Sequence, residues 1–169
     1  SVMLLLSMST MAAAEEPPRP LSGEGQARGV VIGIVGMPVR IVAPATTPGG
    51  TLNVGDVISA GDELRVGTGE QVALLWDHRA VLTLREGARM NIQESHRGQT
   101  ELLLHQGMVR IALSYNAGRM TDTLTLQTLL ARVVSRGGIM EATVLGGERQ
   151  SLLARLITAP PGDTLRVLE

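Results

Sequence analysis

The chain has 169 residues, a formal net charge of −1, 44% hydrophobic residues and 18% charged residues, which suffices for one domain with a buried core. The lack of cysteine excludes disulfides, thiolate metal sites and cysteine nucleophiles. The sequence has only two aromatic side chains, Trp76 and Tyr115, and no concentrated block of basic residues. Both observations argue against a nucleic-acid partner.

The first 28 residues predict export followed by a linker. Residues 2–11 (VMLLLSMSTM) are mostly apolar and precede the small residues Ala12 to Ala14, so 1–14 is expected to be a signal peptide that lacks its basic n-region. This run is shorter than the about 20 apolar residues that cross a bilayer, so no membrane span is expected; a buried helix is the alternative. Residues 15–28 are rich in Pro, Gly and charge, which predicts a disordered linker.

From residue 29 to residue 169 the sequence predicts one all-β domain. Short apolar runs alternate with turn residues, and many runs have a period of two, as in Val109, Ile111 and Leu113. Strands that recur every ~8–12 residues are typical of a sandwich, barrel or β-solenoid. The predicted strands are 29–35, 38–43, 62–66, 70–76, 80–84, 88–92, 100–104, 108–113, 123–127, 130–135, 139–144, 152–157 and 164–168.

Helices are expected to be few or absent. No window keeps the i, i+3, i+4, i+7 pattern of a long helix, although 126–134 and 150–157 are rich in Leu and Ala and could form short ones. Glycines such as Gly55, Gly61 and Gly107 fall between the predicted strands, where turns often need a positive φ. The predicted fold is a two-layer β-sandwich or a β-solenoid-like domain.

Residues 29–144 resemble the FecR domain of bacterial envelope regulators. The first marks are the paired Gly-Asp turns, Val54-Gly55-Asp56 and Ala60-Gly61-Asp62, and the Gly67-Thr68-Gly69 step before the strand at 71–76. The segment 80–92 (AVLTLREGARMNI) then resembles the strand-turn-strand that follows in the family.

Further marks follow in the family's order. Leu102-Leu103-Leu104 precedes Gly107-Met108-Val109-Arg110, and 126–144 resembles the closing stretch of the domain. The resemblance implies a non-enzymatic periplasmic or secreted domain that passes a signal through protein contacts. Because FecR proteins signal through a membrane helix and a cytoplasmic segment that this sequence does not show, a stand-alone signalling or scaffolding module is expected.

Trp76-Asp77-His78-Arg79 interrupts the apolar runs and admits three interpretations. An Asp beside a His can orient an imidazole for proton transfer, but the alternation on both sides predicts a turn at 77–79. The family usually carries an Asp-Gly turn there, so this chain departs from its pattern. Trp is frequent at interface hot spots, so these four residues are the candidate partner contact; Trp76 alternatively caps the end of the core.

No catalytic residue, cofactor or metal site is predicted. His78, His96 and His105 are far apart in the sequence, and no nucleophile elbow or phosphate-binding loop is present. Met90 and Met108 are predicted to be core residues. An enzyme with a cryptic histidine and carboxylate metal site is one alternative.

The expected function is contact with an unknown envelope protein, which docks by strand addition or on an exposed β-face. The main alternative is a module that binds a small ligand or a polysaccharide of the cell envelope.

Overall fold

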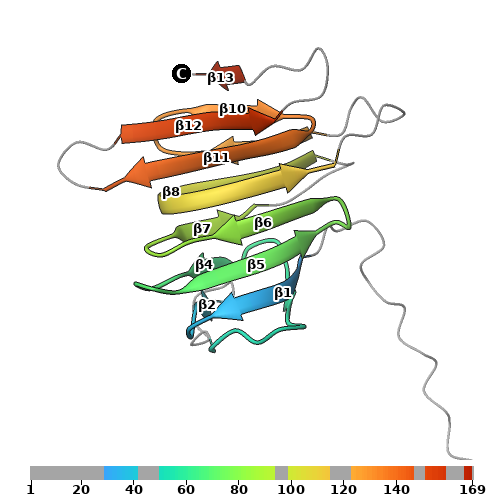
Figure 1. The fold of residues 1–169 in the computed structure, drawn as a ribbon, viewed down its shortest axis with the longest axis vertical. Helices are drawn as coiled ribbons and strands as arrows, with labels where there is room; N and C mark the ends of the chain where they lie inside the picture. Colours follow the sequence, from blue (N-terminus) through green and yellow to red (C-terminus); the bar gives the residue numbers. More distant parts are fainter. Residues whose placement is uncertain are drawn as a thin grey trace, which may run out of the picture.

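The computed structural model describes residues 29–41, 50–93, 99–114, 123–146, 151–158 and 166–168, which contain no helix. Their strands form two layers (Figure 1). The strands are β1 Gly29–Val35, β2 Val39–Ile41, β3 Val57–Ile58, β4 Glu63–Arg65, β5 Gln71–Trp76, β6 Ala80–Leu84, β7 Arg89–Ile92, β8 Gln99–Leu113, β9 Thr123–Gln127, β10 Arg132–Ser135, β11 Gly138–Leu145, β12 Ser151–Thr158 and β13 Arg166–Leu168. The all-β prediction is confirmed.

Sheet A is the front layer of Figure 1 and is antiparallel throughout. Its order is β3-β1-β5-β6-β8-β11-β12, which places β6 at the centre and β12 at one edge. The segment 150–157, which could have been a helix, falls in β12 instead. Its Leu152, Ala154 and Leu156 face the core while the alternate residues are exposed, so tertiary packing overrides helix propensity here.

Sheet B lies behind sheet A and has the order β2-β4-β7-β8-β9-β10-β13. Among the strands that the structure describes, its one parallel pair is β8 with β9. The 15-residue strand β8 belongs to both sheets: Gln99 to Gln106 pairs in sheet B, and Gly107 to Leu113 pairs in sheet A. The two layers are therefore joined by one bent strand.

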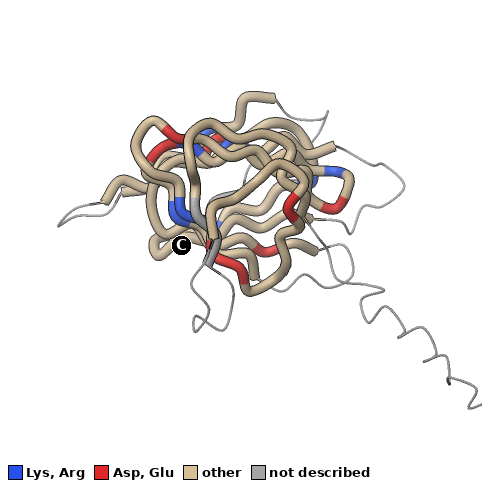
Figure 2. Tube along the Cα trace, turned by 90° about the horizontal axis from the view of Figure 1, so that it is seen from below, with Lys and Arg blue, Asp and Glu red and all other residues tan. Residues whose placement is uncertain are grey.

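The core lies between the two sheets and is built from aliphatic side chains and one indole. Inward-facing residues such as Leu74, Leu82, Leu104 and Ile111 are at most 1% exposed. Charged residues lie mainly on loops and outer faces, which leaves the interior between the layers apolar (Figure 2). The core is therefore formed by close packing of Val, Leu, Ile, Met and Ala, with few aromatic side chains.

Two consecutive turns explain the paired Gly-Asp motif. The Asn53 N–H donates to the Asp56 carboxylate at 2.8 Å, and the Ser59 N–H donates to the Asp62 carboxylate at 2.9 Å. The glycine before each aspartate has a positive φ, 96° at Gly55 and 92° at Gly61, as the third position of a type II turn requires. The hydrogen bond and the positive φ within each turn therefore explain why Gly and Asp occur together in this motif.

Replacing Asp62 by alanine is expected to lower the free energy of unfolding by about 1–3 kcal/mol, because Asp62 is 4% exposed and the Ser59 N–H would lose its carboxylate acceptor. The matched Asp56→Ala change removes the same bond at a more exposed turn and is expected to cost only about 0.5–1 kcal/mol. Urea unfolding followed by tryptophan fluorescence measures both. Equal losses would show that burial of the turn is not what matters.

Two strand assignments made from the sequence were wrong. The runs 100–104 and 108–113 were separated at Gly107, whereas β8 continues through this glycine. The short strand β3, Val57–Ile58, was not predicted, because two residues are too few to show alternation. The segment 126–134 is strand and turn, not a helix.

Candidate protein-binding face

An aliphatic stripe crosses the outer face of sheet A. The register places one outward residue from each strand in a single row, and every member is aliphatic. In strand order across the sheet, the stripe is Val57, Val30, Leu75, Val81, Ala112, Ile139 and Ile157; Ile157 lies at the bulge beside Ile139.

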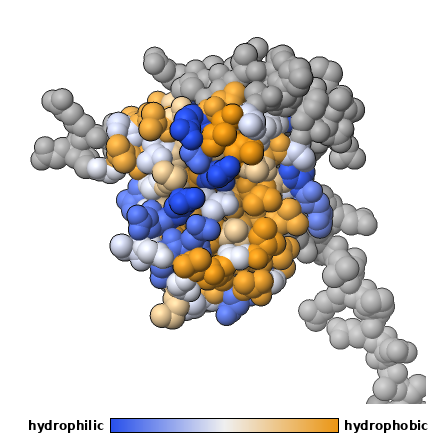
Figure 3. All heavy atoms as spheres, viewed as in Figure 1, coloured by the Kyte–Doolittle hydropathy of each residue, from blue (hydrophilic) through white to orange (hydrophobic). Residues whose placement is uncertain are grey.

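The stripe faces solvent rather than the core. Its five central members are half-buried, while the end members Val57 and Ile157 are 46% and 36% exposed. Ile32, at the β1 bulge, adds a further 47% exposed side chain to the same face. Figure 3 shows the result as a broad apolar area on the right of the sheet A face. A contiguous apolar patch of this kind on a soluble protein commonly marks a binding surface.

A charged row lies next to the stripe, one residue pair further along the strands. Arg110, Glu141 and Arg155 are neighbours on β8, β11 and β12, and Glu141 contacts both arginines, at 4.0 Å and 3.6 Å. On the other half of the sheet the same row contains the uncharged residues Thr83, Ala73 and Gly33, and the exposed bulge residue Ile32 lies beside Gly33. The row therefore has a charged half and an uncharged half.

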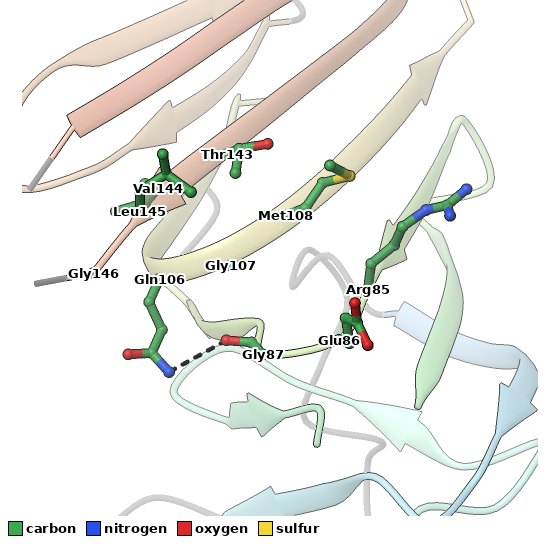
Figure 4. Close-up of a pocket in the computed structure, with 10 residues that line it drawn as sticks. All are labelled: Arg85, Glu86, Gly87, Gln106, Gly107, Met108, Thr143, Val144, Leu145 and Gly146. Carbon is green, nitrogen blue, oxygen red and sulfur yellow. Dashed lines mark hydrogen bonds between the residues drawn. The ribbon is translucent and has the colours of Figure 1, made fainter. Parts of the chain in front are cut away.

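A hollow of about 570 Å³ lies near the far end of the same face, where β8 leaves sheet B for sheet A. Figure 4 shows Met108 and Thr143 on two adjacent strands, with Arg85 and Glu86 on the turn beside them. Met108 is thus half-exposed and lies on the outer face, so its prediction as a core residue was wrong, whereas Met90 is fully buried. The lining of the hollow is mixed, with apolar residues such as Met108 and Val144 and polar ones such as Arg85 and Gln106.

The outer face of sheet B carries a different group of side chains, which are polar. Glu63 on β4 accepts hydrogen bonds from Arg89 at 3.0 and 3.1 Å and from Arg65, and His105 contacts Asn91 across β7 and β8. Burial raises the pKa of Glu63, but the hydrogen bonds from Arg89 and Arg65 outweigh it and lower the pKa overall. This cluster is internally paired and serves to hold β4, β7 and β8 together.

Acidification below neutrality is expected to destabilise the fold through His105. Burial lowers the pKa of His105, Arg89 lowers it further, and Glu63 opposes them in part. The unfolded state therefore binds the proton more readily, so this contribution is present above the ordinary value of 6.5 and is lost as pH falls through the lower folded pKa.

Urea unfolding of the wild type and His105→Gln between pH 7.5 and 5.5 measures this contribution. The variant, which keeps a polar partner for Asn91, is expected to show the shallower loss of stability, whereas parallel curves would assign the loss to other groups.

The hairpin between β5 and β6 confirms the predicted turn at 77–79. Asp77 and His78 have φ values of 48° and 53°, the pair of positive angles of a type I′ turn, and the Arg79 N–H donates to the Trp76 carbonyl at 3.0 Å. Ser114 donates to the Arg79 carbonyl from its N–H and its hydroxyl, at 2.9 and 3.0 Å. The turn is thereby fixed to the end of β8.

The hairpin corrects the candidate contact Trp76-Asp77-His78-Arg79. Trp76 has no exposed surface, and its indole N–H donates to the Thr100 hydroxyl at 3.1 Å, so it belongs to the core and cannot reach a partner. The Arg79 side chain is only 15% exposed and donates to the Thr123 carbonyl. Only Asp77 and His78 are accessible, and they lie at a turn rather than on the stripe.

The histidines do not converge in the described part of the chain. His78 is at the hairpin and His105 is on the outer face of sheet B, while His96 and Tyr115 lie outside the described residues. Within the described ranges, no three side chains of His, Cys, Asp or Glu gather in a group that could hold a metal ion.

No family model, no curated protein and no solved structure matches this chain. Across the residues that the structure describes, we find no helix with the length and hydropathy needed to cross a membrane. The candidate site is therefore defined by the surface itself.

The stripe was not predicted from the sequence. Its members are spread from residue 30 to residue 157. In runs such as QVALLW both alternating sets of residues are apolar, so the sequence does not distinguish the outward set from the core-facing set. The outward apolar residue of each predicted strand was the available signal, but only the strand order places those residues in one row.

Proposed function

We propose that this chain is a non-enzymatic FecR-like β-domain of the bacterial envelope that works by binding proteins. The observation that supports the proposal is the aliphatic stripe, because seven aliphatic side chains in a row on an outer face have no role in the core of the domain. The order of the FecR-like motifs supports the proposed family, and the signal-peptide layout at residues 1–14 supports a periplasmic or secreted location.

A partner is expected to dock on the exposed face of sheet A rather than to add a strand to its edge. Among the described strands, sheet A ends at the two-residue strand β3 and at β12, where Arg155 stands in the middle of the outward set, between Leu153 and Ile157. A charge in the middle of an edge strand discourages the pairing of another strand. The stripe, in contrast, is uninterrupted across the sheet.

A photo-reactive amino acid at Leu75, on the stripe, tests the proposal in intact cells of the source organism. Ultraviolet light is expected to link this position to discrete protein partners, which mass spectrometry then identifies. The control position is Leu129, which is 69% exposed between β9 and β10 of sheet B. A folded protein that gives no protein adduct from Leu75, or equal adducts from both positions, would contradict the proposal.

The gene neighbourhood separates the two forms of the proposal. An adjacent sigma factor and outer-membrane receptor would favour envelope signalling, and their absence would favour scaffolding.

A second candidate, binding of a small envelope ligand, draws on the hollow beside Met108 and Thr143. Its mixed apolar and polar lining suits a small molecule with one polar end. A saturable rise in melting temperature with one compound, abolished by Met108→Glu, would favour this function over protein binding.

A further inference from the structure

We infer that the aliphatic stripe is the contact between two copies of this chain, packed face to face through sheet A. The inference rests on the proposed function, because it names the partner that covers the same surface. It is carried by three properties of the face: its twist, its size and the distribution of its side chains.

The first property is the twist. Stacked β-sheets pack with their strands within about 30° of each other, and they fit because their twists match. A second sheet A has the same seven strands and therefore the same twist as the first. A second copy thus presents a surface of the right shape.

The second property is the size of the face. Strands lie ~4.8 Å apart and outward residues follow every ~6.7 Å, so each outward residue covers ~30 Å² of the sheet plane. Three outward rows over the strands of sheet A then cover about 600 Å² of the sheet plane. The surface area of the protruding side chains adds to this value. A standard interface buries about 800 Å² on each partner, so the whole face is of the size that a stable dimer needs.

The third property is complementarity across a two-fold axis parallel to the strands and passing over β6, the central strand. Such an axis brings Val81 against Val81 of the second copy and keeps stripe on stripe. It also places the charged half of the neighbouring row over the uncharged half: Arg110 faces Ala73 of the other copy, and Glu141 faces Gly33 beside the bulge residue Ile32. The long Arg110 side chain thus lies over a small residue, and no two like charges are brought together in that row.

Sedimentation velocity of the full chain over a wide concentration range tests the inference. The wild type is expected to shift to twice the 17.9 kDa of one chain as concentration rises. Val81→Arg, at the two-fold axis, is expected to stay monomeric, and Ala112→Arg is a second stripe variant should the first not fold. The matched control Leu129→Arg adds the same charge at a 69% exposed position in the loop between β9 and β10 and is expected to dimerise like the wild type. Circular dichroism checks the fold of each.

A wild type that stays monomeric at every concentration would overturn the inference, and so would a Val81→Arg variant that dimerises normally. These outcomes are distinct from failure of the proposed function. A monomeric chain whose Leu75 position still crosslinks to a different protein leaves the protein-binding function standing and removes only the second copy. A monomeric chain without any adduct removes both.

Discussion

Replacing Gly107 by alanine is expected to destabilise the domain strongly. Gly107 is the point where β8 passes from sheet B to sheet A, and its φ is 81°, a conformation that costs a residue with a side chain about 1–2 kcal/mol. A Cβ atom at this position would also overlap the Ala88 backbone, only 2.5 Å from its nitrogen. Because backbone atoms cannot move aside as a flexible side chain can, we expect a total loss of at least ~3 kcal/mol.

The control is Gly87→Ala, in the turn that Gly107 touches. Gly87 also has a positive φ, 71°, but a Cβ there would meet nothing within 4 Å. This variant is expected to fold with a loss of about 1 kcal/mol. Circular dichroism and urea unfolding measure both. A Gly107→Ala variant as stable as Gly87→Ala would show that β8 does not make this close approach.

Removing the indole of Trp76 is expected to cost about 3–5 kcal/mol, because a large side chain with no exposed surface leaves a cavity that the core fills only in part. Trp76 stands on β5 of sheet A, and its N–H bonds to Thr100 on the sheet B half of β8. The indole therefore links the two layers. Urea unfolding of Trp76→Ala, followed by circular dichroism, measures the loss.

A matched variant separates the hydrogen bond from the packing. Thr100→Val keeps the shape of a 1% exposed side chain but removes the acceptor of the indole N–H, so a loss of about 1–3 kcal/mol is expected. The fluorescence of Trp76, the single tryptophan, should also shift on unfolding in this variant as in the wild type. A loss below 0.5 kcal/mol for Trp76→Ala would place the indole on the surface and restore it as a partner contact.

Most strands and turns could be predicted from patterns among neighbouring residues in the sequence. β1, β6 and β9 have the residues expected from alternation alone, and the turn at 77–79 follows from the polar triplet between two alternating runs. These features depend on neighbours in the sequence, which is why the sequence reveals them.

Features that depend on distant strands could not be predicted in this way. Gly107 has the sequence signature of a turn, and only the pairing of β8 with both β7 and β11 makes it a bend within one strand. Trp76 had two interpretations, and the position of Thr100 across the sandwich decides between them. The stripe likewise exists only once β1, β5, β6, β8 and β11 lie side by side.

The central claim, that the aliphatic stripe is covered by protein in the cell, can be measured by thiol labelling, since the chain has no cysteine of its own. Val57→Cys places a thiol on the stripe at a 46% exposed position, and Leu129→Cys places one on sheet B. Both are treated with a membrane-impermeant maleimide, in intact cells and as dilute purified protein. We expect both thiols to react in dilute solution, but only Leu129→Cys to react readily in cells. Equal labelling of the two thiols in cells would contradict the claim.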